Sequence, residues 1–296
     1  MQIARTIKEA RELRSTTPGK VALVPTMGTL HEGHLRHVHR CREIADHVLL
    51  SIFVNPTQFG PGEDYHRYPR QLDQDLEQCR AAGVRGVFVP SEEQIYPPHS
   101  VNSAVDVPVL TGDLEGTFRP GHFLGVCRIV LKLLSIIQPH FVTFGLKDYQ
   151  QLRVIDAMVC DLAIPVRIIE VQTVREVDGL AISSRNRFIA PAQRKRALGL
   201  YKSLKQAKMM IEQEGEVDPQ VVERAMAQVL IAHQLEVDYA VVRHPVTLGR
   251  LNQLDSALTG GVVVLVAVRL GDIRLIDNFQ LLATAQSAGD SSGTVC

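Results

Sequence analysis

Short apolar runs alternate with longer amphipathic stretches over roughly the first 172 residues of the chain. The runs are rich in β-branched and aromatic residues, which favours buried strands; they are Val21–Val24, Val48–Val54, Val87–Val89, Phe141–Phe144 and Val166–Val171. The stretches between them predict helices at Leu35–Ile44, Asp73–Ala82, Val126–Ile137 and Gln150–Leu162. This strand–helix–strand alternation predicts a parallel sheet with right-handed crossovers.

The pattern changes after residue 172. Residues 192–212 and 222–232 place apolar side chains three to four positions apart, which predicts two amphipathic helices. Two or three strands follow, which we expect to pair antiparallel: Val237–Val242, Val262–Val268 and Ile273–Leu275.

Two domains follow from this change of pattern. We predict an α/β chain with a Rossmann-like parallel-sheet domain over residues 1–175 and a smaller α+β domain over residues 176–284. Residues 285–296 are mostly small and polar, a composition typical of a disordered tail.

Composition and charge narrow the classes of function. The 296 residues include 32 basic and 32 acidic side chains, so no global field attracts nucleic acid or an anionic membrane. The five cysteines form no C-x-x-C pair, so we expect free thiols in a reducing compartment. The start of the chain lacks the apolar core of a signal peptide, and the run Val262–Val268 is too short to span a bilayer. We therefore predict a cytoplasmic protein.

Two histidines lie at the turn between the first predicted strand and the next helix. The turn reads Pro-Thr-Met-Gly-Thr-Leu-His-Glu-Gly-His and ends at His34. Backbone N–H groups and the helix dipole favour anions at such a turn, and imidazoles add further donors. Gly33 would let the backbone approach a ligand closely. The turn therefore predicts phosphate or nucleotide binding.

Two plainer interpretations of these histidines stay open. His31, His34 and His37 could share one helical face and hold a metal ion, although a zinc-protease motif needs its second histidine at the position of Leu35. They could also be surface residues without a role.

Further candidate ligand-binding segments follow other predicted strands. Asn55–Phe59 and Gly145–Asp148 each come directly after a strand, so we expect them to meet the histidine turn at one edge of the sheet. Lys147 offers a point charge to phosphate, and the amides of Gln58 and Gln151 suit a hydroxylated, uncharged group. A capped helix start is the plainer interpretation of Gly145–Asp148.

Ser183-Ser184-Arg185 is a second candidate anion site, because hydroxyl and guanidinium groups give strong hydrogen bonds to phosphate. The same three residues are common in loops that bind nothing. Taken with the histidine turn, the segment could hold the other side of a triphosphate.

Two other groups of polar residues have open interpretations. Asp73 and Asp75, one turn before Gln78, could orient a metal-bound phosphate or form a solvated helix face. Arg119 and His122 could close over the site or be structural.

Five motifs, in this order, closely resemble those of the pantothenate synthetase (pantoate–β-alanine ligase) family, part of the cytidylyltransferase-like nucleotidyltransferase superfamily. They are Pro25–His34, Phe53–Phe59, Arg119–Phe123, Gly145–Gln151 and Ser183–Asn186. The resemblance runs from about residue 20 to residue 190 and continues weakly to Leu270–Asn278. One departure concerns Leu146, where the family normally has Glu. If that residue acts through its backbone nothing is lost, whereas a carboxylate that orients Lys147 would be missing.

The resemblance implies an ATP-dependent ligase, a homodimer, and Mg²⁺ held mainly by the ATP phosphates rather than by protein ligands. It implies that Gln58 and Gln151 hold pantoate, that Gln58 also lies near β-alanine, and that His34 has an acid role. The implied ATP contacts are Met27, Gly28, Thr29, Leu30, His31, Glu32, Gly33, His34, Gly145, Leu146, Lys147, Asp148, Val174, Ile182, Ser183, Ser184 and Arg185.

The hypothesis for catalysis is charge stabilisation during attack of pantoate on ATP, followed by attack of β-alanine on the adenylate. The expected catalytic residues are His31, His34, Lys147, Ser183, Ser184 and Arg185. We expect the smaller domain to act as a lid that excludes water. Three alternatives stay open: a nucleotidyltransferase with a phosphorylated acceptor, a nucleotide-binding protein that has lost catalysis, and a histidine-metal hydrolase.

Overall fold

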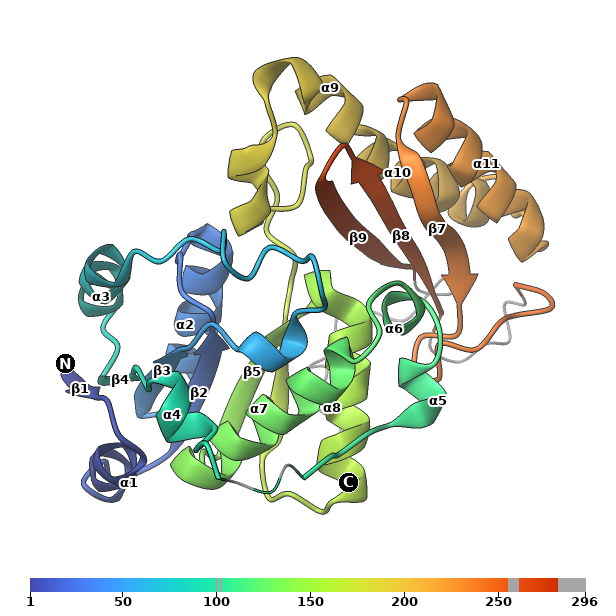
Figure 1. The fold of residues 1–296 in the computed structure, drawn as a ribbon. Helices are drawn as coiled ribbons and strands as arrows, with labels where there is room; N and C mark the ends of the chain where they lie inside the picture. The colour runs from blue at the N-terminus through green and yellow to red at the C-terminus, as the bar shows by residue number, and fades with distance from the viewer. Residues whose placement is uncertain (100, 102, 255–260, 282–296) are drawn as a thin grey trace. The chain divides into compact units, whose positions relative to one another are not determined.

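The structure is a computed structural model and describes residues 1–99, 101, 103–254 and 261–281 (Figure 1). The chain divides into two compact units. The first contains Met1–Gly145 and Gln151–Gln172, and the second contains Leu146–Gln150 and the described chain from Thr173 onward. The predicted tail, residues 285–296, lies outside the described residues.

A six-stranded sheet forms the centre of the first unit, with strand order β1-β4-β3-β2-β5-β6 and every pair parallel. The prediction of a parallel α/β sheet is therefore confirmed, including all five predicted strands. The sequence analysis missed β1, whose three residues are too few to show a periodic pattern. The strands are β1 Gln2–Ala4, β2 Val21–Thr26, β3 His47–Ile52, β4 Gly86–Phe88, β5 Phe141–Gly145 and β6 Arg167–Val171.

Helices cover both faces of this sheet. Helices α2 and α3 pack on one face, where Val38 and Cys79 join Val24 and Leu50 in one buried cluster. On the other face, Leu13 of α1 and Leu49 of β3 both lie against Gly86, and α1 also packs against α7. The helices of this unit are α1 Ile7–Ser15, α2 Glu32–Ile44, α3 Leu72–Ala81, α4 Glu92–Ile95, α5 Pro108–Thr111, α6 Glu115–Phe118, α7 His122–Ile137 and α8 Tyr149–Asp161, whose first two residues belong to the second unit.

The strand order brings the ligand-binding candidates together along the sheet. Strand β2 lies between β3 and β5. The histidine turn follows β2, the 3-10 turn η1 (Pro56–Gln58) follows β3, and Gly145 ends β5. Because parallel strands end at the same edge, these segments leave three adjacent strand ends. The expectation that these three segments share one edge of the sheet is confirmed for the residues at which each segment leaves its strand.

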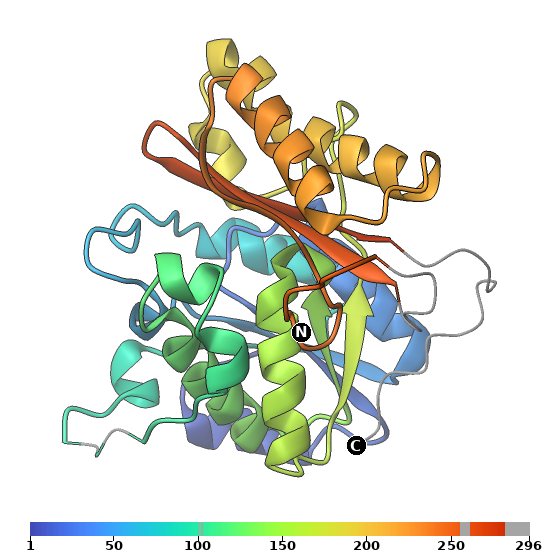
Figure 2. The ribbon, with the colours of Figure 1, turned by 90° about the vertical axis from the view of Figure 1, so that its right-hand side faces the viewer.

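The second unit contains an antiparallel sheet, β7 Glu236–Arg243, β8 Val262–Leu270 and β9 Ile273–Leu281. Helices α10 Gly199–Glu212 and α11 Pro219–Ala232 cover one face of it (Figure 2). The predicted helices and antiparallel strands are confirmed, except that the helix predicted over residues 192–212 is continuous only from Gly199. The remaining elements are η2 Leu146–Asp148, η3 Ser184–Phe188, η4 Pro191–Gln193 and α9 Arg194–Ala197.

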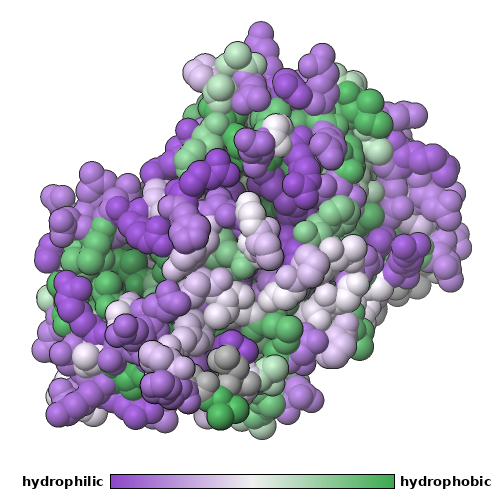
Figure 3. All heavy atoms as spheres, viewed as in Figure 1, coloured by the Kyte–Doolittle hydropathy of each residue, from purple (hydrophilic) through white to green (hydrophobic). Residues whose placement is uncertain are grey.

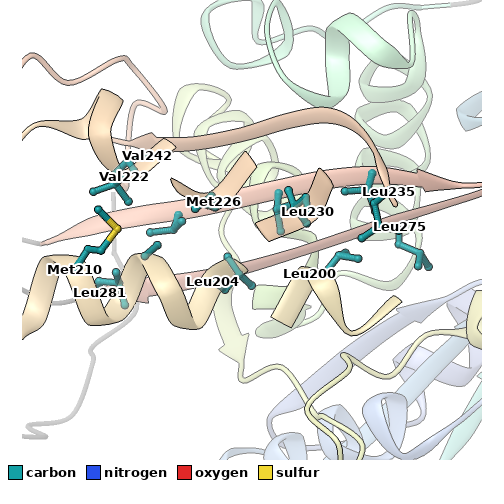
Figure 4. Close-up of a cluster of buried hydrophobic side chains, with 14 of the residues drawn as sticks. Leu200, Leu204, Met210, Val222, Met226, Leu230, Leu235, Val242, Leu275 and Leu281 are labelled. Carbon is teal, nitrogen blue, oxygen red and sulfur yellow. The ribbon is translucent and has the colours of Figure 1, made fainter. Parts of the chain in front are cut away.

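A cluster of aliphatic side chains holds α10 and α11 on this sheet (Figure 4). Leu204, Met226 and Leu230 are fully buried in it, facing Val264 and Val266 of the central strand. The i, i+3, i+4 spacing of the sequence therefore marks the face of each helix that packs.

Three cysteines of the first unit, Cys41, Cys79 and Cys127, are free and buried. Burial raises the pKa of Cys41 and Cys79 to about 12, so both thiols stay uncharged at neutral pH. Cys160 instead takes part in a disulfide, so the expectation of free thiols is wrong for this residue.

The visible surface is mostly hydrophilic, and hydrophobic side chains gather on it in separate patches (Figure 3). Within the described part of the chain, no helix is long and apolar enough to cross a membrane.

The Leu204→Ala variant should lose about 3 kcal/mol of unfolding free energy, because it leaves a cavity in the cluster beneath α10. Urea unfolding followed by circular dichroism measures this loss. Met209→Ala on the same helix is the control, since Met209 is 36% exposed, and it should change stability by less than about 1 kcal/mol. Equal losses in the two variants would contradict the assignment of the packed face.

Candidate active site

The histidine turn places two imidazoles against each other at the start of α2. The rings of His31 and His34 stack with centroids 4.0 Å apart. His31 is the N-cap residue of α2, but its side chain makes no capping hydrogen bond. A Cβ at Gly33 would lie 2.8 Å from the His31 ring, so a larger residue here would displace the ring from its stacked position. Both rings are thereby held at the helix N-terminus, where an anion is favoured.

A buried carboxylate holds the turn that leads to these histidines. Asp75 of α3 is 1% exposed and accepts hydrogen bonds from the N–H groups of Thr29 (2.8 Å) and Leu30 (2.7 Å). Thr29 has a φ of 56°, and a Cβ at Gly28 would lie 2.9 Å from the Asp75 carboxylate. Asp75 is therefore neither on a solvated face nor a phosphate-orienting residue, because both its oxygens bind main chain. Asp73 on the same helix is exposed.

The Asp75 contacts leave fewer free N–H groups at this turn than the sequence suggested. The N–H groups of Thr29 and Leu30 already donate to the Asp75 carboxylate, so a phosphate at this turn would be bound by other donors. Glu32, Gly33 and His34 form the first turn of α2, where N–H groups have no acceptor within the helix. The burial of Asp75 could have been found from the sequence. Helical spacing places it with Leu72, Leu76 and Cys79 on the apolar side of α3.

Gln58 lies in η1, and its side-chain amide is held at both ends. Asn55, 1% exposed, donates to Gln58 Oε1 (3.0 Å) and to the carbonyl of Gly125 (3.1 Å). The Gln58 Nε2 group lies 3.1 Å from the sulfur of Met27. A Cβ at Gly125 would lie 2.1 Å from the Thr57 carbonyl, so glycine allows α7 to approach η1. Gln58 and Met27, two residues expected to bind substrates, are therefore in contact.

Arg119 and His122 bind the backbone of the same segment. His122 Nδ1 lies 2.8 Å from the Gln58 carbonyl, and Arg119 Nη1 lies 3.0 Å from His122 Nε2. Because a guanidinium only donates and a carbonyl only accepts, the ring is neutral and carries its proton on Nδ1. Arg119 also pairs with Glu63 at 2.7 Å. Of the two interpretations left open by the sequence, these contacts fit the structural one.

Burial and the neighbouring Arg119 lower the pKa of His122 to about 4. Burial raises the pKa of Glu63 and the Arg119 guanidinium lowers it, and the net shift is downward. Glu63 is therefore ionised and His122 neutral at pH 7.

In the second unit, Ser183–Arg185 follows a short hairpin. Arg175 and Ala181 pair across it, and the N–H of Ile182 donates to the carbonyl of Val174 (2.9 Å). Ser183 is the N-cap residue of η3, and its hydroxyl accepts from the N–H of Arg185. The predicted residues Val174 and Ile182 are thus bonded to each other, directly before the Ser-Ser-Arg segment.

The segment around Lys147 forms the short 3-10 turn η2. Lys147 is partly exposed, with its ammonium 3.3 Å from Asp148. Leu146, the departure from the family pattern, is 4% exposed, so its side chain belongs to the interior. Gln151 is half-buried in the first turn of α8.

Among the residues that the structure describes, no group of three or more histidine, cysteine or acidic side chains has a geometry suited to a metal ion. The arrangement of His31, His34 and His37 therefore supplies no observation in favour of a histidine-metal site.

Parallel α/β sheets bind ligands at the carboxyl ends of their strands, and the candidate residues of the first unit follow these ends. This is the architecture of a nucleotide-binding α/β protein. The chain matches the family model for pantoate-beta-alanine ligase over residues 2–280. It therefore belongs to the pantoate–beta-alanine ligase family.

Named relatives and solved structures agree with this membership. The chain is 46% identical to a pantothenate synthetase of Neisseria meningitidis, covering 95% of this chain and 99% of the relative. It is similar to the crystal structure of pantothenate synthetase from Thermus thermophilus, with a TM-score of 0.89, 44% identity, and coverage of 95% and 100%. A ligase structure from Francisella tularensis, complexed with beta-gamma ATP and beta-alanine, has a TM-score of 0.78, 33% identity, and coverage of 95% and 97%.

Asp75→Asn should lower the unfolding free energy by about 2 kcal/mol, because one of two buried N–H groups then faces an amide donor. Urea denaturation at pH 7 gives the value. Asp73→Asn makes the same chemical change at an exposed position of α3 and should leave stability nearly unchanged. An Asp75→Asn variant as stable as the Asp73→Asn control would contradict the role given to Asp75.

Lowering the pH from 7 to 5 should reduce the unfolding free energy of the wild-type chain by about 2 kcal/mol more than it reduces that of the His122→Gln variant. The folded pKa of His122 is about 4 and its ordinary value 6.5, so the unfolded state binds the extra proton between these values. The contribution is present above pH 6.5 and is lost as the pH falls towards 4. Urea titrations at both pH values test this, with His39→Gln, an exposed histidine, as the control. Equal pH dependence in wild type and His122→Gln would contradict a neutral buried ring.

Proposed function

We propose that the chain joins pantoate to β-alanine and cleaves ATP to AMP and pyrophosphate. The observation that carries this proposal is the family match over residues 2–280, because it spans both units and every motif quoted from the sequence. Binding of ATP and β-alanine is supported by the Francisella tularensis ligase, which was solved with both kinds of ligand.

In the first step, a pantoate carboxylate oxygen attacks the α-phosphorus of MgATP. A P–O bond to pantoate forms, the bond to the β-phosphate oxygen breaks, and pyrophosphate leaves with that electron pair. The substrate carboxylate is already a nucleophile, so the protein's task is positioning and charge stabilisation. The charged or polar groups proposed for this task are His31, His34, Lys147, Ser183, Ser184 and Arg185.

In the second step, the amine of β-alanine attacks the acyl carbon of pantoyl-adenylate. The amide bond forms, the bond to the AMP oxygen breaks, and the amine loses a proton. We propose that Gln58 binds pantoate and lies near β-alanine, and that Gln151 also binds pantoate. The paired contacts of the Gln58 amide support this role, because they fix a donor and an acceptor in one orientation.

The residues proposed to bind ATP are Met27, Gly28, Thr29, Leu30, His31, Glu32, Gly33, His34, Gly145, Leu146, Lys147, Asp148, Val174, Ile182, Ser183, Ser184 and Arg185. Mg²⁺ enters as part of the MgATP substrate. We further propose a homodimer, from the family resemblance, and a cytoplasmic location, where ATP is available.

Catalytic loss, one of the three alternatives, had Leu146 as its only support in the sequence. The side chain of Leu146 is buried, which supports a role for this position through its backbone. A glutamate is then not needed for the turn to form, and activity is expected.

With MgATP and pantoate alone, the protein should release about one equivalent of pyrophosphate per site, and β-alanine should start steady turnover. His34→Ala and Lys147→Ala should slow adenylate formation by roughly a hundred- to a thousandfold, with little loss of stability. Rapid-quench measurement of pyrophosphate, with thermal unfolding of each variant, gives both quantities.

The exposed residues His39 and Lys208 provide matched controls, since their alanine variants remove the same groups outside the proposed site. Near-wild-type adenylation by Lys147→Ala would remove Lys147 from the mechanism. A wild-type chain that binds ATP but releases no pyrophosphate in either assay would favour the non-catalytic alternative.

A further inference from the structure

Asn278 of β9 bonds directly to the turn that carries Lys147. Its Nδ2 group donates to the carbonyl oxygen of Leu146 (2.8 Å) and to that of Lys147 (2.9 Å). Asn278 is 5% exposed, and it lies 132 residues after Leu146 in the chain. One amide group therefore holds two consecutive carbonyls of η2.

This contact matters because η2 has little stability of its own. It is a 3-10 turn of three residues, and hydrogen-bond geometry is poor in such short turns. Without Asn278, each of the two carbonyl groups would lose a donor at a buried or part-buried contact, which is costly. The backbone on both sides of the Lys147 Cα is thus held by a side chain as well as by the turn's own hydrogen bonds.

Asn278 is itself held rigidly. Consecutive residues of a strand point to opposite faces, and Asp277 lies on the face that packs against the helices. The Asp277 carboxylate accepts two hydrogen bonds from Arg175 (2.6 and 2.9 Å) and one from the N–H of Asn278 (2.8 Å). The Arg175 guanidinium lies 5.2 Å from the ring centre of Tyr201 and 4.9 Å from that of Phe279.

Further contacts on the Asn278 face reach the residue after η2. Gln280 donates to the hydroxyl of Tyr149 (3.1 Å), which donates to the carbonyl of Pro245 (2.8 Å). Asp277 and Asn278 thus connect β9 to two segments, the hairpin of Arg175 that precedes Ser183 and the turn of Lys147.

We propose that Asn278 is a positioning residue for Lys147, acting through the two carbonyls of η2. The inference rests on the proposed function, in which Lys147 stabilises charge on the ATP phosphates. It also assigns a role to position 146: the carbonyl serves the site, while the buried side chain anchors the turn. A leucine there is therefore compatible with a correctly placed Lys147.

The test is a double-mutant cycle on the rate of adenylate formation in the full-length chain. Asn278→Asp keeps the shape but turns a carboxylate towards two carbonyl oxygens, and Asn278→Ala removes the donor without adding charge. Each should slow pyrophosphate release in the presence of pantoate by about 10- to 100-fold, as expected for misplacement of a group by about 1 Å. In a Lys147→Ala background, the same substitutions should slow the reaction less than threefold further.

Gln280→Glu is the matched control, because it makes the same amide-to-acid change two residues along β9 without touching η2. It should retain at least half of the wild-type rate. Thermal unfolding of every variant separates misplacement from loss of fold, and rates are compared per folded molecule. If Asn278→Asp does not fold, Asn278→Ala carries the comparison.

Each result decides between the two proposals. Loss of rate that disappears in the Lys147→Ala background supports Asn278 as a positioning residue. Wild-type rates for Asn278→Ala, or losses that multiply with that of Lys147→Ala, contradict this role while leaving the ligase function intact. A wild-type chain that releases no pyrophosphate contradicts the proposed function, and the inference with it.

Discussion

The first unit depends on a buried ion that binds main chain rather than another side chain. A carboxylate in the interior is costly unless it is fully hydrogen-bonded. Asp75 meets this condition only while Thr29 and Leu30 keep the conformation that aims both N–H groups at it. The positive φ of Thr29 and the absence of a side chain at Gly28 follow from that geometry. The position of the two stacked histidines therefore depends on the packing of α3 beside the sheet.

In the second unit, a distant side chain also binds the main chain of a turn, but as a donor instead of an acceptor. There the bound groups of the turn are carbonyls, and an amide donor from β9 binds them. In both units, a side chain distant in sequence binds the backbone of a turn. A turn fixed in this way needs no rearrangement when charge develops on a ligand, which is the condition for electrostatic stabilisation.

The sequence predicted what depends on local pattern. Apolar runs marked five of the six strands of the first unit, and helical spacing marked the packed faces of α10 and α11. The histidine turn was recognisable because glycine and histidine at a strand-to-helix junction have few structural reasons to occur together. The bonding partners of Asp75 and Asn278 could not be predicted, since each is fixed by contacts that span 45 residues or more. The only local signals were a carboxylate on an apolar helix face and two residues of low strand propensity in β9.

The sequence left two interpretations of Leu146 open. A side chain that is 4% exposed cannot present a carboxylate to solvent or to a phosphate without first leaving the interior. Its carbonyl, by contrast, is already bound by Asn278. Substitution at such a position changes the packing beneath the turn but not the number of hydrogen bonds that define it. The conformation of η2 is thus stabilised from β9, and residue 146 is free to be apolar as long as it fills its buried place.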